Sequence, residues 1–360
     1  RDDVESRGLG DVYKRQYFKK ASYYAQLVKN EGHSLTAKYW DFFIDICSDK
    51  YNTALNKDGA KANESIWEVE FAGNRSTDVR AEGRIGNIIG IPGKDLSSKS
   101  SITGKGDPGY AYAFIWSTPK LLELYEANND IDRCNWNIAP FTYTQSAGEG
   151  TPVDGREFVK GKRDEVEQQY WDKSFSYGKT NPGSTYGDRE SKNDANKNRN
   201  RAAAKYRREY EADKKSKNDT SINFPLLRYS DILLMIAEAE NEVNHGPNDL
   251  AYECINAVRE RAGISKLQEN LDETNFREAI KDERAMELCF EYTRRFDLIR
   301  WGDYYKLMQE QVSKAQTDES WKFGINVYTY FNIPKSYNYF PIPANEIGSN
   351  GAIKTNNPGW

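Results

Sequence analysis

Three neighbouring blocks of sequence decide the fold of this chain. They read FPLLRYSDILLMIAEAENEV over residues 224–243, AVRERAGI over residues 257–264 and DERAMELCFEYTRRFDLIRW over residues 282–301. In each block apolar residues return every three or four positions between charged ones, which is the pattern of amphipathic helices. This part of the chain is therefore predicted to be helical.

The spacing predicts a pair of adjacent helices and a third long helix. The first helix covers residues 226–243, and the second covers residues 251–262 before Gly263 ends it. Small residues such as Ala237 let antiparallel helices approach closely, so the pair is expected to form a tetratricopeptide-like unit. The third helix is expected over residues 276–300, with a break near Tyr292 and Thr293.

Further elements are expected earlier in the chain. Apolar residues at near-helical spacing from Tyr17 predict a helix that ends at residues 30–32, and alternation over residues 65–71 predicts a strand. A helix over residues 118–127 is expected to have Thr118 as its N-cap, because a proline follows at the first helical position.

The three helical blocks, the sequence FPIPANEI over residues 340–347 and the closing NNPGW over residues 356–360 resemble, in this order, the C-terminal half of the SusD/RagB family. The resemblance covers residues 17–360. It implies a mainly α fold, in which a tetratricopeptide-like α/α superhelical scaffold packs against a loop-rich lobe with a few short strands. It also implies that an N-terminal segment with a lipid-anchoring cysteine precedes this sequence.

The organisation follows from composition and from the resemblance. Residues 1–16 are charged and patternless, and are expected to be a non-native leader; the rest is one SusD-like domain lacking its N-terminal segment. Within it we expect helices and a strand over 17–82, a loop-rich ligand lobe over 83–222, the helical repeat over 223–310 and an irregular tail over 311–360.

Composition excludes several classes of function. The 360 residues carry a net charge of -4, which gives no electrostatic reason to expect nucleic acid as a partner. Four widely spaced cysteines form no Cys-x-x-Cys pair, so free and mostly buried thiols are expected. With two histidines and no phosphate loop, no metal site or cofactor is expected, and residues 128–132 are interpreted as a turn that ends a helix rather than as a calcium loop.

One carboxylate pair could serve an enzyme. Glu283 and Glu287 lie four residues apart on one face of the third helix, and glycoside hydrolysis requires two carboxyl groups. Arginines nearby in the sequence, including Arg284 and Arg300, favour a partly buried ion-pair network instead. We therefore predict no catalytic residue, with a glycoside hydrolase kept as the alternative.

Sugar binding requires aromatic planes beside polar side chains, and the loop-rich region has both. The candidate glycan-binding residues are Asp107, Tyr110, Tyr112, Trp116, Asn135, Trp136, Tyr170 and Trp171. These residues are chosen for their chemistry alone, since ligand residues vary among family members.

The resemblance implies a function without catalysis. Members are surface lipoproteins of the outer membrane that bind starch or other poly- and oligosaccharides and deliver them to a SusC-like TonB-dependent transporter. The expected partners are thus a glycan and that transporter, with contact to the membrane only through the lipid anchor. A helical-repeat adaptor that binds a protein or a peptide is the remaining alternative.

Overall fold

The computed structural model shows a mainly helical protein with one short β-ribbon. The structure describes residues 2–47, 64–71, 83–90, 111–112, 114–138, 203–211, 219–317 and 331–360. Within these ranges the only named strands, β1 and β2, pair with each other, and the other elements are helices. The expectation of a mainly α fold with few strands is confirmed.

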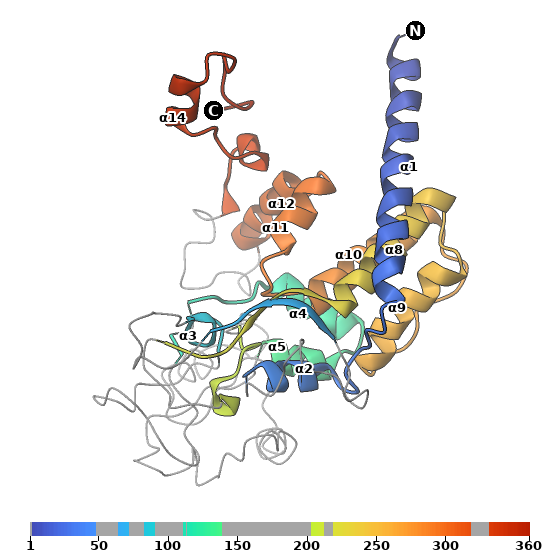
Figure 1. The fold of residues 1–360 in the computed structure, drawn as a ribbon, viewed down its shortest axis with the longest axis vertical. Coiled ribbons are helices and arrows are strands. Elements are labelled where there is room, and N and C mark those ends of the chain that lie inside the picture. The colour runs from blue at the N-terminus through green and yellow to red at the C-terminus, as the bar shows by residue number, and fades with distance from the viewer. Residues whose placement is uncertain are drawn as a thin grey trace.

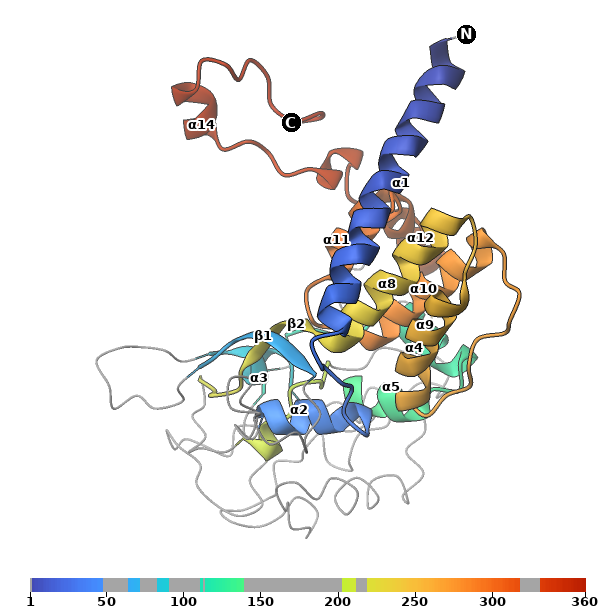
Figure 2. The ribbon, with the colours of Figure 1, turned by 45° about the vertical axis from the view of Figure 1, so that its right-hand side comes forward.

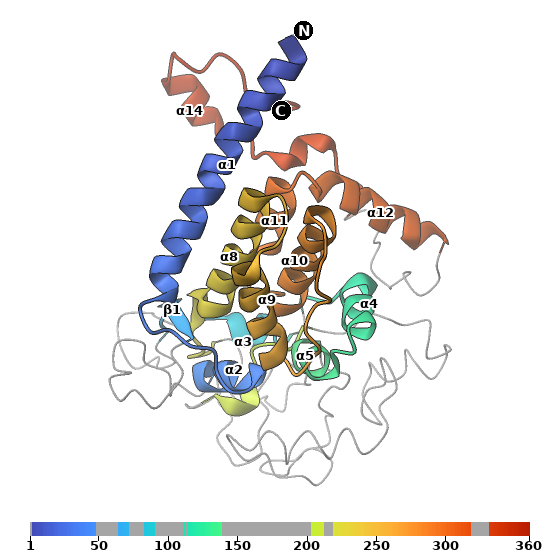
Figure 3. The same ribbon diagram turned by 90° about the vertical axis from the view of Figure 1, so that its right-hand side faces the viewer.

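A group of packed helices forms the scaffold of the molecule. Figure 3 shows α8 (Tyr229–Asn244), α9 (Asp249–Arg261) and α10 (Glu273–Glu287) side by side, with α1 (Asp2–Lys29) running along α8 and extending beyond it. Their apolar faces form one core of buried residues, to which Phe276 contributes a side chain with no exposed surface. The predicted pair of antiparallel helices is α8 and α9.

Local sequence fixes the ends of the scaffold helices. The side chain of Asn248 accepts a hydrogen bond from the amide of Ala251 at 2.9 Å and so caps the start of α9. At the other end Gly263 adopts φ +80°, a left-handed conformation that favours glycine, and its amide donates to the carbonyl of Glu260. The expectation that Gly263 ends this helix is confirmed.

Two expected helix starts and one expected helix cap differ from the observed ones. The first scaffold helix begins at Tyr229 rather than residue 226, because residues 224–228 form strand β2 (Phe224–Arg228) and pair with β1 (Ser65–Val69). The helix expected from Tyr17 begins at Asp2, so it includes most of the segment set aside as a leader. Thr118 precedes α4 but makes no capping hydrogen bond with its side chain.

The expected third helix is two helices. After α10 the chain turns through Phe290 and Tyr292, both at positive φ, and α11 (Arg294–Arg300) follows. The break near Tyr292 is thus confirmed, although α10 already ends at Glu287. Figure 1 shows α11 and α12 (Tyr304–Thr317) on the side of α10 away from α1, and in Figure 2 α1 lies in front of them.

A second group of elements lies below the scaffold in Figure 1. These elements are α2 (Tyr39–Cys47), α3 (Ile85–Ile88), α4 (Pro119–Ala127), α5 (Ile131–Asn137) and the 3-10 helix η3 (Arg208–Tyr210). Aromatic side chains dominate its core, including Phe42, Phe43 and Tyr206. The four cysteines are free and buried, as expected.

The tail is less irregular than expected. Despite Pro341 and Pro343, it contains the 3-10 helix η5 (Lys335–Asn338) and the short helix α14 (Ala344–Ser349). The second proline occupies the position before the first residue of α14, where its lack of an amide proton costs no hydrogen bond.

Because α8 and α9 approach each other closely, we expect that a side chain larger than that of Ala237 would lower the stability of the protein. This residue has no exposed surface and lies in the core between the scaffold helices. Ala237→Leu should lower the free energy of unfolding by about 1–3 kcal/mol, because the added carbons have no space. Urea denaturation would measure the change.

Glu260→Leu is the matched control, since the Glu260 side chain on α9 is 54% exposed. Its effect should stay within about 0.5 kcal/mol. Equal midpoints for the two variants would show that the interface between α8 and α9 is not tightly packed.

Candidate functional site

The Glu283 and Glu287 pair lies in the interior of the protein. Both side chains have no exposed surface. Glu283 accepts hydrogen bonds from Arg133 at 2.6 Å and from Arg259 at 2.9 Å. Glu287 accepts from Arg133 at 2.8 Å and from Arg228 at 2.6 Å. Each carboxylate is therefore neutralised by guanidinium groups from other elements.

These contacts belong to a larger set that we call the buried ion network. Its ten members are the cations Arg133, Lys205, Arg228, Arg259 and Arg261 and the carboxylates Glu64, Asp130, Glu283, Glu287 and Glu291. No side chain among them is more than 8% exposed. Five positive charges meet five negative ones, so the network has no net charge to bury.

The network joins segments that are far apart in the sequence. Arg228, at the end of β2, donates to Glu64 at 2.9 Å and to Glu291 at 2.8 Å. Arg261, at the end of α9, donates to Glu64 at 2.8 Å and also contacts Glu287. Glu64 precedes β1, so these bonds fix the start of the ribbon against α9 and α10.

The network also closes the C-terminal end of α10, whose last carbonyl groups lack partners within the helix. The carbonyl of Glu287 accepts hydrogen bonds from Arg228 at 2.7 Å, Lys205 at 2.9 Å and the Tyr39 hydroxyl at 3.2 Å. Positive side chains at this helix end are further stabilised by the helix dipole.

The pKa values in the network follow from burial and from the neighbouring charges. Burial alone would raise the pKa of Glu287 and of Glu291, but nearby cations outweigh it and hold both pKa values below their ordinary range. For Glu287 these cations are chiefly Arg261 and Arg228. Burial raises the pKa of Asp130 to about 6, because the charge of Arg133, which lowers this pKa, offsets only part of the effect of burial.

This arrangement is structural and gives the carboxylate pair no access to a substrate. A glycosidase needs one carboxyl group that protonates a bound substrate, whereas Glu283 and Glu287 are enclosed and bonded to arginines. The predicted ion-pair network is present, but its partners are not the arginines nearby in the sequence. Arg284 pairs instead with Asp231 at 2.6 Å and Asp297 at 2.8 Å.

Trp136 does not form a ligand platform in this structure. The Trp136 side chain is 0% exposed, and the guanidinium carbon of Arg207 lies 4.0 Å from its ring centroid. Arg207 donates to the carbonyls of Asn135 at 2.7 Å and Trp136 at 3.1 Å. Their contacts hold Arg207, and the Trp136 ring has no face open to a sugar.

An aromatic pair lies at the surface before α4. The rings of Tyr112 and Phe114 stack with centroids 4.9 Å apart and planes 11° apart. Phe114 is 68% exposed, and Tyr112 is half-buried. The amide of Tyr112 donates to the carbonyl of Asn87 at 2.8 Å, which anchors the pair beside α3. The pair offers an exposed aromatic surface of the kind that a pyranose ring can cover.

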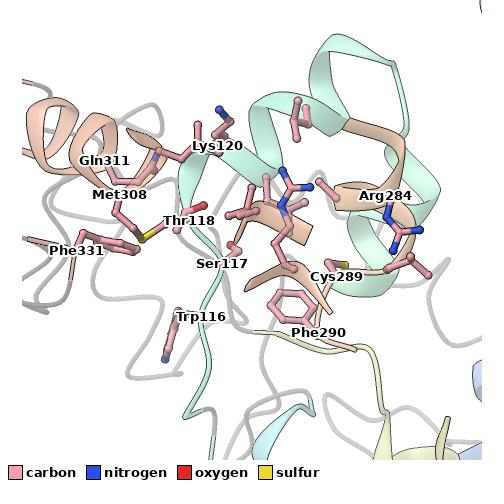
Figure 4. Close-up of a pocket in the computed structure, with 17 residues that line it drawn as sticks. Trp116, Ser117, Thr118, Lys120, Arg284, Cys289, Phe290, Met308, Gln311 and Phe331 are labelled. Atoms are coloured by element: carbon pink, nitrogen blue, oxygen red, sulfur yellow. The ribbon is translucent and has the colours of Figure 1, made fainter. Parts of the chain in front are cut away.

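Phe114 was not among the candidates chosen from the sequence. The signal was available, because Tyr112, Phe114 and Trp116 occupy alternate positions, and side chains two apart in an extended chain lie on the same side. The half-buried Trp116 lines a pocket between α4, α10 and α12 (Figure 4). Tyr112 and Trp116 are thus both half-buried, whereas Trp136 is fully buried.

The remaining candidates, Asp107, Tyr110, Tyr170 and Trp171, lie outside the described residues. In the ranges that the structure describes, no group of three or more His, Cys, Asp or Glu side chains could hold a metal ion. Residues 128–130 form the turn between α4 and α5, and residues 131–132 begin α5, where the Asp130 side chain accepts from the amide of Arg133 at 3.3 Å. None of the described helices is both long and apolar enough to cross a membrane.

The buried ion network predicts a large cost for removing one charge. Glu287→Gln should lower the free energy of unfolding by about 3–5 kcal/mol, because it leaves buried arginines without their counter-charge. Thermal and urea denaturation would measure the loss. Glu278→Gln on the same helix is the control, since this side chain is 60% exposed and should change stability by at most about 1 kcal/mol. Similar losses in both variants would contradict the structural role of the network.

The pKa shifts predict a two-sided dependence of stability on pH. Glu287 and Glu291 have lowered pKa values in the folded protein, so they stabilise it above pH 4.5, their ordinary pKa, and this contribution is lost as the pH falls further. Asp130 has a raised pKa, so its protonation as the pH falls from about 6 to 3.8 favours the folded state. Asp130→Asn can still cap α5. This variant should remove the gain in stability between about pH 6 and 3.8 and keep the loss of stability at lower pH. An unchanged profile between pH 7 and 5 in this variant would contradict the assignment.

Comparison with known proteins gives consistent matches. The sequence model of the SusD family matches residues 63–360. SusD-like protein P25 of Formosa agariphila is 38% identical over 136 residues, which cover 37% of this chain and 23% of that protein. SusD-like protein P2 of the same organism is 30% identical over 149 residues, covering 39% and 27% of the two chains. The matches thus span about a quarter of each relative.

Solved structures agree with this fold. A SusD homolog from Bacteroides thetaiotaomicron superimposes with a TM-score of 0.68 at 26% identity, over 95% of this chain and 59% of that one. A laminarin binding SusD-like protein gives a TM-score of 0.52 at 18% identity, over 98% and 61% of the two chains. With a family match over most of its length and a helical scaffold shared with a solved homolog, the chain belongs to the SusD family.

Proposed function

We propose that this chain captures glycans without cleaving them. Membership of the SusD family supports the proposal, and the observation that carries it is the stacked and exposed pair of Tyr112 and Phe114. A pyranose ring presents C–H groups on its faces and hydroxyl groups around its edge. It can therefore cover an aromatic surface while its hydroxyl groups bond to polar side chains or water.

The ligand proposed is an oligo- or polysaccharide. Among solved structures with the same fold, one is named as a laminarin binding protein, which supports a polymeric glucan as the first ligand to try. The residues that remain proposed for glycan binding are Asp107, Tyr110, Trp116, Asn135, Tyr170 and Trp171. The buried position of Trp136 removes it from this proposal.

Catalysis is not part of the proposed function. The acidic pair that would serve a glycoside hydrolase consists of Glu283 and Glu287, and four arginines of the buried ion network occupy its oxygens. A hydrolase acting through these residues would have to expose them, which would break the network.

Delivery is the second half of the proposal. We infer that the glycan passes to a SusC-like TonB-dependent transporter, and that the protein works as a surface lipoprotein of the outer membrane. The family resemblance supports this role. Co-purification of the chain with such a transporter from outer-membrane extracts would test it, and the absence of any complex would contradict delivery while leaving glycan capture standing.

The aromatic pair predicts the outcome of a binding experiment. In native gels that contain laminarin, starch or other polysaccharides, one glycan should retard the protein, and Phe114→Ala should weaken the retardation about two- to tenfold. This range corresponds to the roughly 0.5–1.5 kcal/mol of an aromatic contact. The glycan recovered from the gel should be uncleaved.

Phe296→Ala is the matched control, because Phe296 on α11 is also exposed, at 61%, but lies on another element. Its retardation should equal that of the unmodified protein. Equal weakening by both variants, or release of reducing sugar, would contradict the proposal. Retention of a peptide but of no glycan would favour the adaptor alternative.

A further inference from the structure

A pocket separates the start of α4 from α12, and one proposed glycan-binding residue, Trp116, lies on its wall. Its volume is about 290 Å³, near the lower end of the range of small-ligand pockets. Figure 4 shows Met308, Gln311 and Phe331 on one side, Cys289, Phe290 and Arg284 on the other, and Ser117 and Thr118 between them. The walls come from α4, α10, α11 and α12, from the turn that follows α10, from residues 116–118 before α4 and from Phe331.

Most of the wall is apolar. Leu121 and Leu124 of α4, Leu298 of α11, and Leu307 and Met308 of α12 all line it. A sugar carries hydroxyl groups around its whole edge and would leave several of them unpaired against such walls. A compact apolar ring suits the walls better.

One polar side chain in the pocket lacks a partner. Gln311 is 4% exposed, and its side-chain oxygen makes no hydrogen bond to any described residue. A buried acceptor without a donor costs stability, so such groups are rare unless something else bonds to them. The Gln311 amide thus marks a position where a ligand's hydroxyl or N–H group would be stabilised.

Two cations line the same pocket without an ion pair. In the described part of the chain, neither Lys120 nor Arg294 has a carboxylate oxygen within 4.0 Å, and Arg294 donates to the carbonyl of Lys281 at 2.9 Å. The charge of Asp282 acts on both cations, and those of Asp297 and Asp303 act on Arg294, but none of these carboxylates lies within 4.0 Å of either cation. Burial lowers the pKa of Arg294 more than Asp297 and Asp282 raise it.

The third cation at the pocket is already balanced. Arg284 bonds to Asp231 and to Asp297 and has no charge to offer. The pocket cations without an ion pair to a described residue are therefore Lys120 and Arg294, at the ends of α4 and α11 that face the pocket. A carboxylate there would make charge-assisted hydrogen bonds in partly buried surroundings.

We propose that this pocket binds a small carboxylic acid with an apolar ring and one hydrogen-bond donor. The carboxylate would bond to Lys120 and Arg294, the ring would contact the leucine walls, and the donor would bond to Gln311. The site is separate from the aromatic pair of Tyr112 and Phe114, and the proposal does not depend on glycan capture.

The probe is 4-hydroxyphenylacetate, which carries all three features. Calorimetric titration of the whole chain should show one site per molecule. Phenylacetate lacks the donor, 4-hydroxyphenylacetamide lacks the charge, and each should bind about tenfold more weakly, as for the loss of one hydrogen bond in a buried site. No binding of 4-hydroxyphenylacetate up to about 10 mM, well above a weak dissociation constant, would overturn the proposal.

Two variants assign the contacts. Gln311→Leu should abolish the difference between 4-hydroxyphenylacetate and phenylacetate without lowering thermal stability, since it removes an unpaired buried group. Lys120→Gln should reduce the preference for the acid over the amide. Lys306→Gln, which removes a charge from the exposed face of α12, should change neither preference. Binding that none of these variants alters would place the acid elsewhere and overturn the proposal.

Discussion

The requirement that buried charges be neutralised inside the protein holds the two groups of elements together. A buried ion without a partner costs several kcal/mol, so each arginine of the network can leave water only when its carboxylates are in place. The single carboxylate of Glu287 contacts guanidinium groups from three elements, α5, β2 and α9. The positions of these elements are therefore linked, and a shift of one would break bonds to the others.

The same network explains why the carboxylate pair on α10 is structural. In a catalytic site, two carboxyl groups face a cavity that a substrate can enter, and their environments differ. Here Glu283 and Glu287 face the interior, and one of their partners, Arg228, also donates to the carbonyl of Glu287 itself. Stability and the end of one helix account for every contact of this pair.

Helix periodicity made much of the scaffold predictable, because spacing of three and four residues is a local property of the sequence. The helices α8 and α9 and the left-handed Gly263 follow from it directly. Pairing across long distances could not be predicted in this way. The strand β2 replaced a predicted helical turn because β1 lies beside it, and Glu283 is bonded to Arg133, 150 residues away, rather than to an arginine in its own block.

The candidate site was predictable only in part, for a similar reason. The same types of aromatic residue bind ligands and fill cores. Only their burial in the folded protein distinguishes the two roles. Trp136 and Phe114 show the contrast, since the first is covered by Arg207 and the second is exposed. Alternate spacing indicated which side an aromatic residue faces but could not show whether that side is covered. The wide sequence separation within the ion network has a further consequence for folding. Glu64 meets Arg228 across 164 residues and Arg261 across 197 residues, so its charge must stay in water until the chain through α9 is available. Closing such long loops is slow, and the protein is therefore expected to fold late and cooperatively, after most of its length is available.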